Sequence, residues 1–478
     1  MPSWKPLTDM PRAKLIPSIE EIVNSPEPLD IFRSVRKRPY SFFLDSVNDP
    51  KKLGRYSFIG CDPFLVFKSK GDNITLAWSD GSKEELRANP FTALKELFSR
   101  YASKSVKGIP FIGGGVGYFS YDLKAFIEEL PERAKDDLGI PDCVFGFYDS
   151  VVICDNLTKR SYLSNLGIAN RSQQVLRDIV KKASSHGRQE TSPVSFGPLR
   201  SNFSKSSYIS AVNKAKRYIK SGDIYQVNIS QRFQTSITGD PFDLYLRLRN
   251  CSPAPFAAYL DCGDVTILSS SPERFLYKNG NYIETRPIKG TRPRGADASE
   301  DLRLARELMD SGKDMAEHIM IVDLERNDLG RICRYGSVAP TESTIIERYA
   351  NVFHLVSTVA GKLKEGVGPI DCLLATFPGG SITGAPKIRS MEIIDSLESV
   401  RRSIYTGAIG YVGFDGNMDT SIVIRTFIAK GKELYFQVGG GIVADSDPEN
   451  EYEETLHKAA GLMQALGIES KDRERVSV

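Results

Sequence analysis

The sequence predicts an α+β fold built on antiparallel sheets. Before residue 180, short segments rich in aromatic and β-branched residues are separated by turn signals, as expected of antiparallel strands; they are residues 40–47, 56–66 and 144–154. After residue 204, further strands are interleaved with helices, but without the regular strand–helix–strand rhythm of a parallel sheet. Both observations favour antiparallel sheets with helices around them.

The region after residue 204 is expected to begin with a helix and a strand. Residues 206–220 carry apolar side chains on one stripe and Gly222 follows their end, which is typical of a helix. A strand is expected at 224–235. Further strands are expected at 256–260, 265–270, 408–414, 421–429 and 433–439, and further helices at 299–311, 385–396 and 451–466. We interpret the glycine run at 113–117 as a tight bend.

The composition divides the chain into three parts. Its 478 residues, 41% hydrophobic and 26% charged, are ordinary for a globular protein with an ample core. The only compositional break is a polar stretch with Pro193, Gly197 and Pro198, which indicates an exposed linker. We therefore expect a strand-rich region at 1–180, a linker at 181–203 and a second region at 204–478.

Charge and cysteine usage exclude several classes of function. The net charge of +3 comes from 63 basic and 60 acidic residues, which leaves no basic excess to attract nucleic acid or an anionic membrane. The seven cysteines never form C-x-x-C, as expected of reduced thiols in the cytoplasm. No run of 18 apolar residues occurs. We expect a soluble, cytoplasmic protein with neither a nucleic-acid nor a membrane partner.

Three acidic residues are candidates for a metal site. Glu451 and Glu454 are three residues apart on a predicted helix, so their side chains share one face. With Glu317 they could offer the hard oxygen ligands that Mg²⁺ prefers, the remaining positions being filled by substrate oxygens and water. The alternative is a solvated acidic helix face, which composition alone favours.

Four motifs in order along the chain resemble the chorismate-utilising enzymes. They are S-S-S-P-E-R-F with Glu273, T-R-P-I-K-G-T-R-P-R-G with Lys289, A-E-H-I-M-I-V-D-L-E-R-N-D, and F-P-G-G-S-I-T-G-A-P-K, of which the last is the most specific. The resemblance covers most of residues 40–466. It implies two large antiparallel sheets packed as a sandwich, with helices on the outside and the active site in a cleft between the sheets. It also favours metal binding over a solvated face for the three glutamates.

Two positions discriminate within that family. P-I-K-G-T around Lys289 resembles the aminodeoxychorismate synthase large subunit, whereas anthranilate, isochorismate and salicylate synthases generally carry alanine there. Gln226 occupies the position where isochorismate and salicylate synthases have a lysine that activates water. A neutral amide cannot act as that base. Gln226 therefore argues against water as the nucleophile, the alternative being an ordinary strand glutamine, and Lys289 argues for amination at C4 over C2.

The resemblance implies catalytic roles for Glu273 and Lys289. Glu273 would act as the general acid for the leaving C4 hydroxyl, with its pKa raised by burial or by neighbouring carboxylates. Lys289 would add to ring C2, with its pKa lowered by burial or by Arg286, Arg292 and Arg294. The alternatives are a carboxylate that caps a turn and a lysine that positions the substrate without a covalent bond.

The resemblance also implies a set of substrate contacts. Arginine suits bidentate binding of a carboxylate, and successive glycines let backbone amides approach an anion. The implied substrate-binding residues are Gln226, Thr291, His354, Thr383, Gly384, Ala385, Tyr405, Arg425, Gly439, Gly441 and Lys458.

The N-terminal region contains a possible amino-acid pocket at Leu44, Asp45 and Ser46. These residues resemble the L-L-E-S motif with which anthranilate synthases bind tryptophan as a feedback inhibitor. Here the glutamate is replaced by Asp45, and the second element is N-C-S-P-A-P-F where the anthranilate type has N-P-S-P-Y-M. Both departures argue against inhibition by tryptophan.

No glutaminase is recognisable in the chain, because none of its cysteines lies in a G-x-C-x-G elbow. Ammonia would come from a separate glutaminase subunit or from solution. The predicted function is therefore that of a Mg²⁺-dependent aminodeoxychorismate synthase component I, which makes 4-amino-4-deoxychorismate for para-aminobenzoate and folate synthesis. The alternatives are anthranilate synthase component I, with amination at C2 and loss of pyruvate, and a silent scaffold that only regulates a glutaminase.

Overall fold

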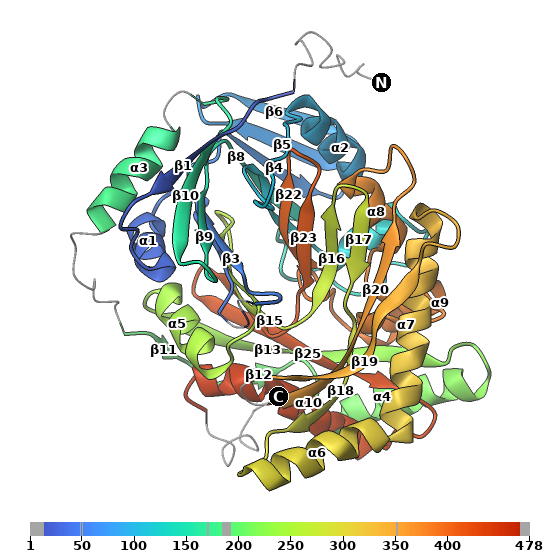
Figure 1. Cartoon of the computed structure of the whole chain (residues 1–478). Coiled ribbons are helices and arrows are strands. Elements are labelled where there is room, and N and C mark those ends of the chain that lie inside the picture. The colour runs from blue at the N-terminus through green and yellow to red at the C-terminus, as the bar shows by residue number, and fades with distance from the viewer. Residues whose placement is uncertain are drawn as a thin grey trace.

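The computed structural model describes residues 14–47, 49, 51–169, 172–183, 193–349 and 352–468. These residues form two large sheets in which neighbouring strands pair antiparallel (Figure 1). Of the predicted linker at 181–203, residues 184–192 lie outside the described residues.

The first sheet has 13 strands in the described part of the chain. In spatial order they are β1 (Ser18–Ile22), β10 (Arg160–Asn165), β9 (Val152–Asp155), β3 (Tyr56–Gly60), β2 (Phe42–Asp45), β14 (Phe256–Asp261), β15 (Thr266–Ser271), β24 (Thr426–Lys430), β25 (Glu433–Ile442), β13 (Gln226–Thr238) and β11 (Ser195–Phe196). Two short strands, β12 (Arg200–Ser201) and β21 (Gly384–Ala385), also pair with β13.

The second sheet has 12 strands, counted over the same described ranges. In spatial order they are β18 (Ile288–Pro293), β20 (Val352–Lys362), β17 (Tyr282–Thr285), β16 (Arg274–Asn279), β23 (Met418–Ile422), β22 (Ala408–Gly413), β7 (Gly114–Phe119), β8 (Cys143–Tyr148), β4 (Leu65–Lys70), β5 (Asn73–Trp78) and β6 (Lys83–Arg87). Strand β19 (Ala339–Arg348) pairs with β20.

Helices surround both sheets. They are α1 (Pro28–Val35), α2 (Pro90–Arg100), α3 (Ser172–Ala183), α4 (Lys205–Lys220), α5 (Pro241–Cys251), α6 (Ala298–Asp310), α7 (Gly312–Ile332), α8 (Pro369–Thr376), α9 (Lys387–Leu397) and α10 (Pro448–Ala465), with 3₁₀ turns η1 (Tyr121–Phe126) and η2 (Gly380–Ile382). Several begin at a side-chain cap: Asp447 accepts from the backbone of α10, and Ser311 from that of α7.

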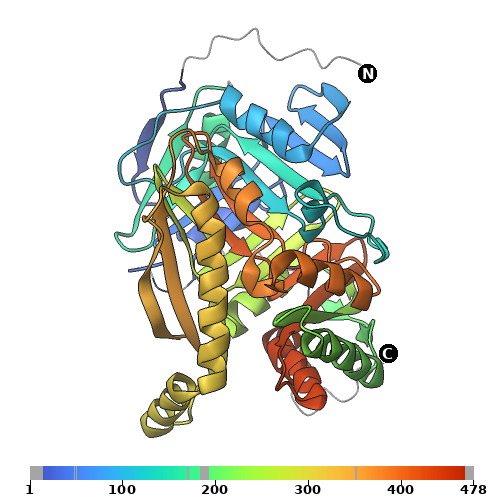
Figure 2. The ribbon, with the colours of Figure 1, turned by 90° about the vertical axis from the view of Figure 1, so that its right-hand side faces the viewer.

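The two sheets pack face to face, which confirms the predicted sandwich. The core between them takes Phe42 and Phe58 from the first sheet and Tyr118 and Tyr411 from the second. The rings of Phe58 and Tyr411 meet edge to face with centroids 5.4 Å apart. Helices α1, α3, α5 and α10 cover the outer face of the first sheet, and Figure 2 shows α7 and α10 on opposite sides of the lower half of the molecule.

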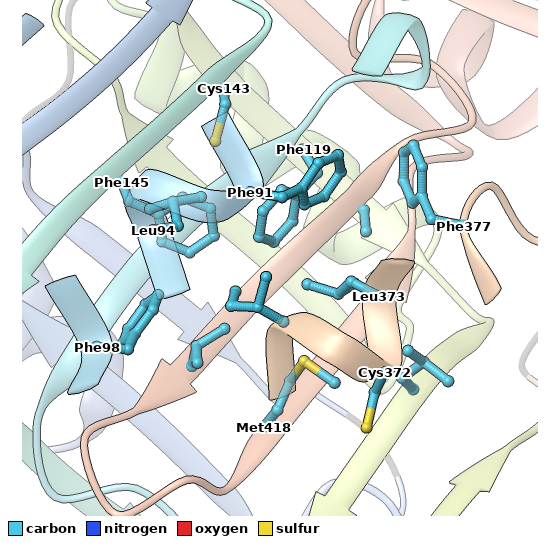
Figure 3. Packing of buried hydrophobic residues seen from close by; sticks show 14 of the residues in the cluster. Phe91, Leu94, Phe98, Phe119, Cys143, Phe145, Cys372, Leu373, Phe377 and Met418 are labelled. Atoms are coloured by element: carbon cyan, nitrogen blue, oxygen red, sulfur yellow. The ribbon is translucent and has the colours of Figure 1, made fainter. Parts of the chain in front are cut away.

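A second core lies on the outer face of the second sheet, under α2 and α8. Figure 3 shows its aromatic part, where Phe91 and Phe98 of α2 meet Phe119 and Phe145 of the sheet. The rings of Phe119 and Phe145 have centroids 4.7 Å apart. No helix among the described residues is long and apolar enough to cross a membrane.

Both sheets contain strands from before and after the predicted linker. In the first sheet β2 pairs with β14, and in the second β7 pairs with β22. The parts of the chain before and after the predicted linker therefore both contribute strands to each sheet.

Three predicted strands are wrong, because each is two strands in different sheets. The segment 421–429 contains the end of β23, in the second sheet, and most of β24, in the first. The chain changes sheet at Arg425, which has a positive φ of 50°. The segments 56–66 and 144–154 divide in the same way, into β3 and β4 and into β8 and β9.

The glycine run at 113–117 is also not a tight bend, because residues 114–117 begin strand β7. A Cβ on Gly117 would lie 1.8 Å from the carbonyl oxygen of Val144, and one on Gly114 would lie 2.3 Å from that of Val412. Glycine is required there by close approach of the neighbouring strands.

Candidate active site

The predicted catalytic residues lie where the two sheets meet. Glu273 is in the two-residue connection between β15 of the first sheet and β16 of the second, and Lys289 is on β18 at the edge of the second sheet. Strand β25 of the first sheet faces them: a Cβ on Gly441 would lie 3.5 Å from Lys289 Nζ. A bare glycine backbone thus borders the lysine amine, where an anion could approach its amides closely.

Ser381 joins the two catalytic candidates. Lys289 Nζ donates to the carbonyl oxygen of Ser381 at 3.1 Å, and Ser381 Oγ donates to Glu273 Oε1 at 2.6 Å. Ser381 belongs to turn η2 and is buried. This role of Ser381 was not predicted, although Ser381 lies within the G-G-S-I-T-G-A-P-K run.

The protein environment shifts the pKa of both groups towards neutrality. Burial raises the pKa of Glu273 to about 7, despite the opposing effects of Ser381 and Lys289. Burial lowers the pKa of Lys289, and the charge of Lys458 lowers it further, while Glu317 opposes the shift. An acid that keeps its proton and an amine that sheds one are both suited to catalysis near neutral pH.

The three arginines near Lys289 in sequence are neutralised by carboxylates. Arg286 pairs with Glu342 and Glu347, Arg292 with Glu307 and Asp314, and Arg294 with Asp301. The cation that lowers the pKa of Lys289 is thus Lys458, and the expected contribution of the arginines is not observed.

Two of the predicted metal ligands, Glu451 and Glu454, lie next to the glycine residues of β25. Glu451 is buried, its Oε1 accepts from Ser446 Oγ at 2.6 Å, and its Oε2 has no hydrogen-bond partner among the described residues. A Cβ on Gly440 would lie 3.1 Å from Glu451 Oε2 and 3.7 Å from Glu454 Oε1. Both carboxylates therefore face the same part of β25.

The third candidate, Glu317, lies across from them on α7. Its Oε2 accepts from Gln226 Nε2 at 3.2 Å, which holds both side chains at the site. Within the described ranges, no three His, Cys, Asp or Glu side chains are gathered closely enough to hold a metal. The unpaired Oε2 of Glu451 is a free hard ligand, so the residues fit an ion such as Mg²⁺ that also takes substrate oxygens and water.

Lys458 extends the positive charge of the site. It pairs with Glu454 at 2.7 Å and donates to the carbonyl oxygen of Gly439 at 3.1 Å. This pairing lowers the pKa of Glu454. The two side chains are 41% and 49% exposed, so both are accessible at the surface of the site.

A second group of predicted substrate contacts is centred on His354. Burial and then the charge of Arg425 lower the pKa of His354 to about 3, so the ring is neutral. Arg425 Nη2 lies 3.4 Å from His354 Nε2, and because arginine only donates, Nε2 is the acceptor. The other nitrogen, Nδ1, then donates to Thr291 Oγ1 at 2.9 Å.

The remaining predicted residues build the wall behind Ser381. Strand β21, which is Gly384 and Ala385, pairs with the start of β13 at Gln226. Gly384 has φ 144°, and a Cβ there would lie 2.2 Å from the carbonyl oxygen of Gln226. Thr383 is fully buried and donates to the carbonyl oxygen of Gly379 at 2.9 Å.

Tyr405 is buried behind the same wall. Its ring lies 5.8 Å from Arg402, which donates to the carbonyl oxygen of Ile382 at 2.9 Å. Arg402 therefore connects Tyr405 to Ile382, the residue that precedes Thr383.

The N-terminal cavity is a separate space of about 840 Å³, lined by Leu44, Asp45 and Ser46 and by Phe256 to Ala258. Asp45 is buried and accepts from Tyr245 Oη at 2.9 Å and from Arg249 Nε at 2.5 Å. The three predicted residues therefore do line one cavity, with the carboxylate of Asp45 already paired inside the protein.

Comparison with known proteins places this geometry in a family. The model of the chorismate binding enzyme family matches residues 41–464. The chain belongs to the chorismate binding enzyme family. The structure is similar to anthranilate synthase component I from Streptococcus pneumoniae, with a TM-score of 0.75 and 33% sequence identity over 85% of this chain and 91% of that one.

Relatives in this family carry two names at the same level of similarity. The chain is 39% identical to anthranilate synthase component 1 of Acetivibrio thermocellus, over 95% of each chain. It is also 39% identical to aminodeoxychorismate synthase component 1 of Bacillus subtilis, over 88% of this chain and 91% of the relative. Anthranilate synthases are the more frequent name among the relatives compared. The chain is thus an enzyme of the group formed by these two synthases, and identity alone does not choose between them.

Proposed function

We propose that this chain aminates chorismate at C4 and forms 4-amino-4-deoxychorismate, with Mg²⁺ as cofactor and ammonia from a separate glutaminase subunit. The observation that carries the proposal is the half-buried amine of Lys289, whose lowered pKa suits a nucleophile, held by Ser381 beside Glu273, whose raised pKa suits an acid. A lysine at this place gives the site a nucleophile that can occupy ring C2, and so directs ammonia to C4.

The proposed reaction has two displacements. In the first, Lys289 Nζ bonds to ring C2, both ring double bonds shift by one position towards C4, and the C4 hydroxyl leaves as water with the proton of Glu273. In the second, ammonia bonds to C4, both double bonds shift back, and the lysine amine leaves C2. The nitrogen added at C4 then gives its excess proton to Glu273, so the sum is chorismate plus ammonia to 4-amino-4-deoxychorismate plus water, and Lys289 and Glu273 return to their starting states.

Binding would orient the substrate through its two carboxylates. Arg425 and Lys458 supply cations, and the backbone of Gly439 and Gly441 can approach an anion without a side chain in the way. Mg²⁺ would be held by Glu451 and Glu454, whose oxygens both lie near Gly440, with Glu317 opposite them as the third proposed ligand, and when bound it would neutralise substrate carboxylate charge as a Lewis acid. The unpaired Oε2 of Glu451 supports this assignment.

The product assay tests the proposal directly. The pure chain is incubated with chorismate, Mg²⁺ and ammonium, and the product is identified by mass and chromatography. We expect 4-amino-4-deoxychorismate. Anthranilate with pyruvate would instead support the second candidate, anthranilate synthase component I, which the more frequent name among the relatives favours.

The role of Lys289 is tested by mass spectrometry of the chain quenched with chorismate and Mg²⁺ but without ammonia. We expect a ring-derived adduct on the peptide that contains Lys289, since nothing then releases the amine from C2. Lys289→Ala should slow C4 amination while chorismate still binds in the presence of Mg²⁺. An unlabelled peptide together with full activity of the alanine variant would remove Lys289 from the mechanism.

The partner is tested with glutamine as the nitrogen source. Because no activated cysteine nucleophile is recognisable in the sequence, glutamine should support turnover only after a separate glutaminase subunit is added. Ammonium at the same concentration of enzyme is the control. Product formed from glutamine by the isolated chain would contradict the assignment.

A further inference from the structure

Glu325 is a buried carboxylate next to the active site with no role in the reaction described above. It lies on α7, eight residues after Glu317, and is 2% exposed. Its Oε1 accepts from the backbone N–H of Gly380 at 3.0 Å. A Cβ on Gly380 would lie 2.6 Å from Leu324 and 3.0 Å from Glu325 Oε1, so α7 packs directly against turn η2.

The residue that Glu325 contacts is the neighbour of the residue that contacts both Lys289 and Glu273. Gly380 is followed by Ser381, whose carbonyl oxygen accepts from Lys289 and whose hydroxyl donates to Glu273. The position of both Ser381 groups depends on how the turn is held. Glu325 holds that turn through its hydrogen bond with the Gly380 N–H.

Glu325 is also costly to keep buried. Its Oε2 has no hydrogen-bond partner among the described residues, and a buried polar atom without a partner reduces stability. Burial, then the charge of Asp328, raises the pKa of Glu325 to about 7, with Glu273 acting in the same direction and Lys387 opposing it. The hydrogen bond to the buried Gly380 N–H is the contact that this carboxylate makes with the turn, and it leaves the second carboxylate oxygen unpaired.

We infer that Glu325 is a positioning residue, which fixes the Gly380–Ser381 turn and thereby the distance between the Lys289 amine and the Glu273 acid. The inference rests on the proposed function only in taking Lys289 and Glu273 as the reacting groups. The oxygen that accepts from Gly380 is the part of Glu325 that matters, because that hydrogen bond is its contact with the turn.

The test compares variants that keep or remove this oxygen, with chorismate consumption in ammonium and Mg²⁺ as the readout. Glu325→Leu fills the space without an acceptor, and we expect kcat to fall about 10²-fold, as for an ångström-scale misplacement of reacting groups. The KM for chorismate should stay within about threefold, because the substrate-binding residues are untouched. Glu325→Gln keeps an acceptor oxygen and should recover kcat to within about tenfold of the unmodified chain.

Two further variants make the test decisive. Glu325→Asp retains the charge but is one methylene too short to reach Gly380, so its kcat should also fall, and this variant serves if the leucine variant does not fold. Asp323→Ala, on the exposed side of the same helix where Asp323 pairs with Arg326, is the matched control and should keep full activity.

Thermal unfolding is measured for every variant, so that a loss of fold is separated from a loss of geometry. An unchanged kcat in the leucine or aspartate variant, an equal loss in the glutamine and leucine variants, or a change confined to KM would overturn the inference. If the product is anthranilate, the proposed C4 chemistry fails, while the Glu325 inference still stands or falls on the rate at which chorismate disappears.

Discussion

Arg286 and Lys289 are cations three residues apart in the sequence, and the protein treats them in opposite ways. Arg286 is buried against the N-terminal cavity, where it donates to Thr358 and pairs with Glu342 and Glu347. Lys289 faces the active site and donates to a backbone carbonyl, and no carboxylate in the described part of the chain lies within ion-pairing distance of its Nζ.

The difference shows what each region requires of its charges. Paired charges are stable in their ionised forms and already have partners inside the protein. Unpaired buried groups can instead bind a charged substrate. In the active site burial raises the pKa of Glu273 to about 7, and at the cavity the pKa of Glu342 is held at about 2. Each region has one exception. On the cavity side burial raises the pKa of Asp419 to about 6 even though it pairs with Arg274, and in the active site Glu454 pairs with Lys458, which lowers the pKa of Glu454.

The largest expected effect comes from removing the acid. Glu273→Gln keeps the size of the side chain and an acceptor for Ser381 but has no proton to give to the leaving hydroxyl. We expect kcat to fall roughly 10²- to 10⁴-fold, the range typical of general acid catalysis. Steady-state kinetics with ammonium would check this, with Glu85→Gln on exposed β6 as the control.

The same substitution should make the protein more stable above neutral pH. The pKa of Glu273 is raised from 4.5 in the unfolded chain to about 7, so ionisation opposes folding as pH rises through that window. At pH 8 the variant should gain up to roughly 3 kcal/mol in the free energy of unfolding, and at pH 4 it should gain nothing. If urea unfolding gave the variant and the unmodified chain the same free energy of unfolding at both pH values, the folded protein would not raise the pKa of Glu273.

Glu454→Gln should give the next largest effect. It removes one charged oxygen from a site built on few carboxylates and leaves Lys458 without its partner. We expect the Mg²⁺ concentration for half-maximal activity to rise about 10- to 100-fold, with less change in rate at saturating Mg²⁺. Titration of activity with Mg²⁺ checks this, and an unchanged Mg²⁺ requirement would remove Glu454 from the metal site.

Local sequence patterns predicted helices α4, α6, α9 and α10 and about half of the strands of the described chain, but not helix α7 or the changes of sheet. Helix α4 lies within one residue of its predicted bounds because its apolar stripe has a clear helical period. The segment 421–429 looked like one strand because its apolar residues continue across the change of sheet at Arg425. Alternation of apolar residues reports burial and does not report which sheet a strand joins.

The same limit applies to the active site. Motifs identified Glu273 and Lys289, whereas Ser381 and Glu325 were missed because their roles come from contacts across long stretches of chain. Ser381 is 108 residues from Glu273 and 92 from Lys289. A serine within a glycine-rich turn carries no local sign of such a bridge, and a glutamate on a helix is more often solvated.

The smallest expected effect is at the N-terminal cavity. Although burial alone would raise it, hydrogen bonds from Lys52 and Thr358 and the charge of Arg286 hold the pKa of Glu342 at about 2, below its ordinary 4.5. A lowered pKa adds stability that is complete above pH 4.5 and is lost as pH falls towards 2. Because the Glu342 side chain is 34% exposed and so partly screened by water, we expect Glu342→Gln to cost only about 1 kcal/mol at pH 7.

Urea unfolding of the unmodified chain and of Glu342→Gln at several pH values from 7 to 3 would measure this cost. The difference should shrink steadily below pH 4.5, opposite in direction to that of Glu273→Gln, while kcat stays within about twofold because no active-site contact changes. A difference that grows on acidification would mean that the Glu342 carboxylate is not stabilised by its partners. The proposed difference between the N-terminal cavity and the active site would then be wrong for Glu342, the cavity carboxylate on which it rests.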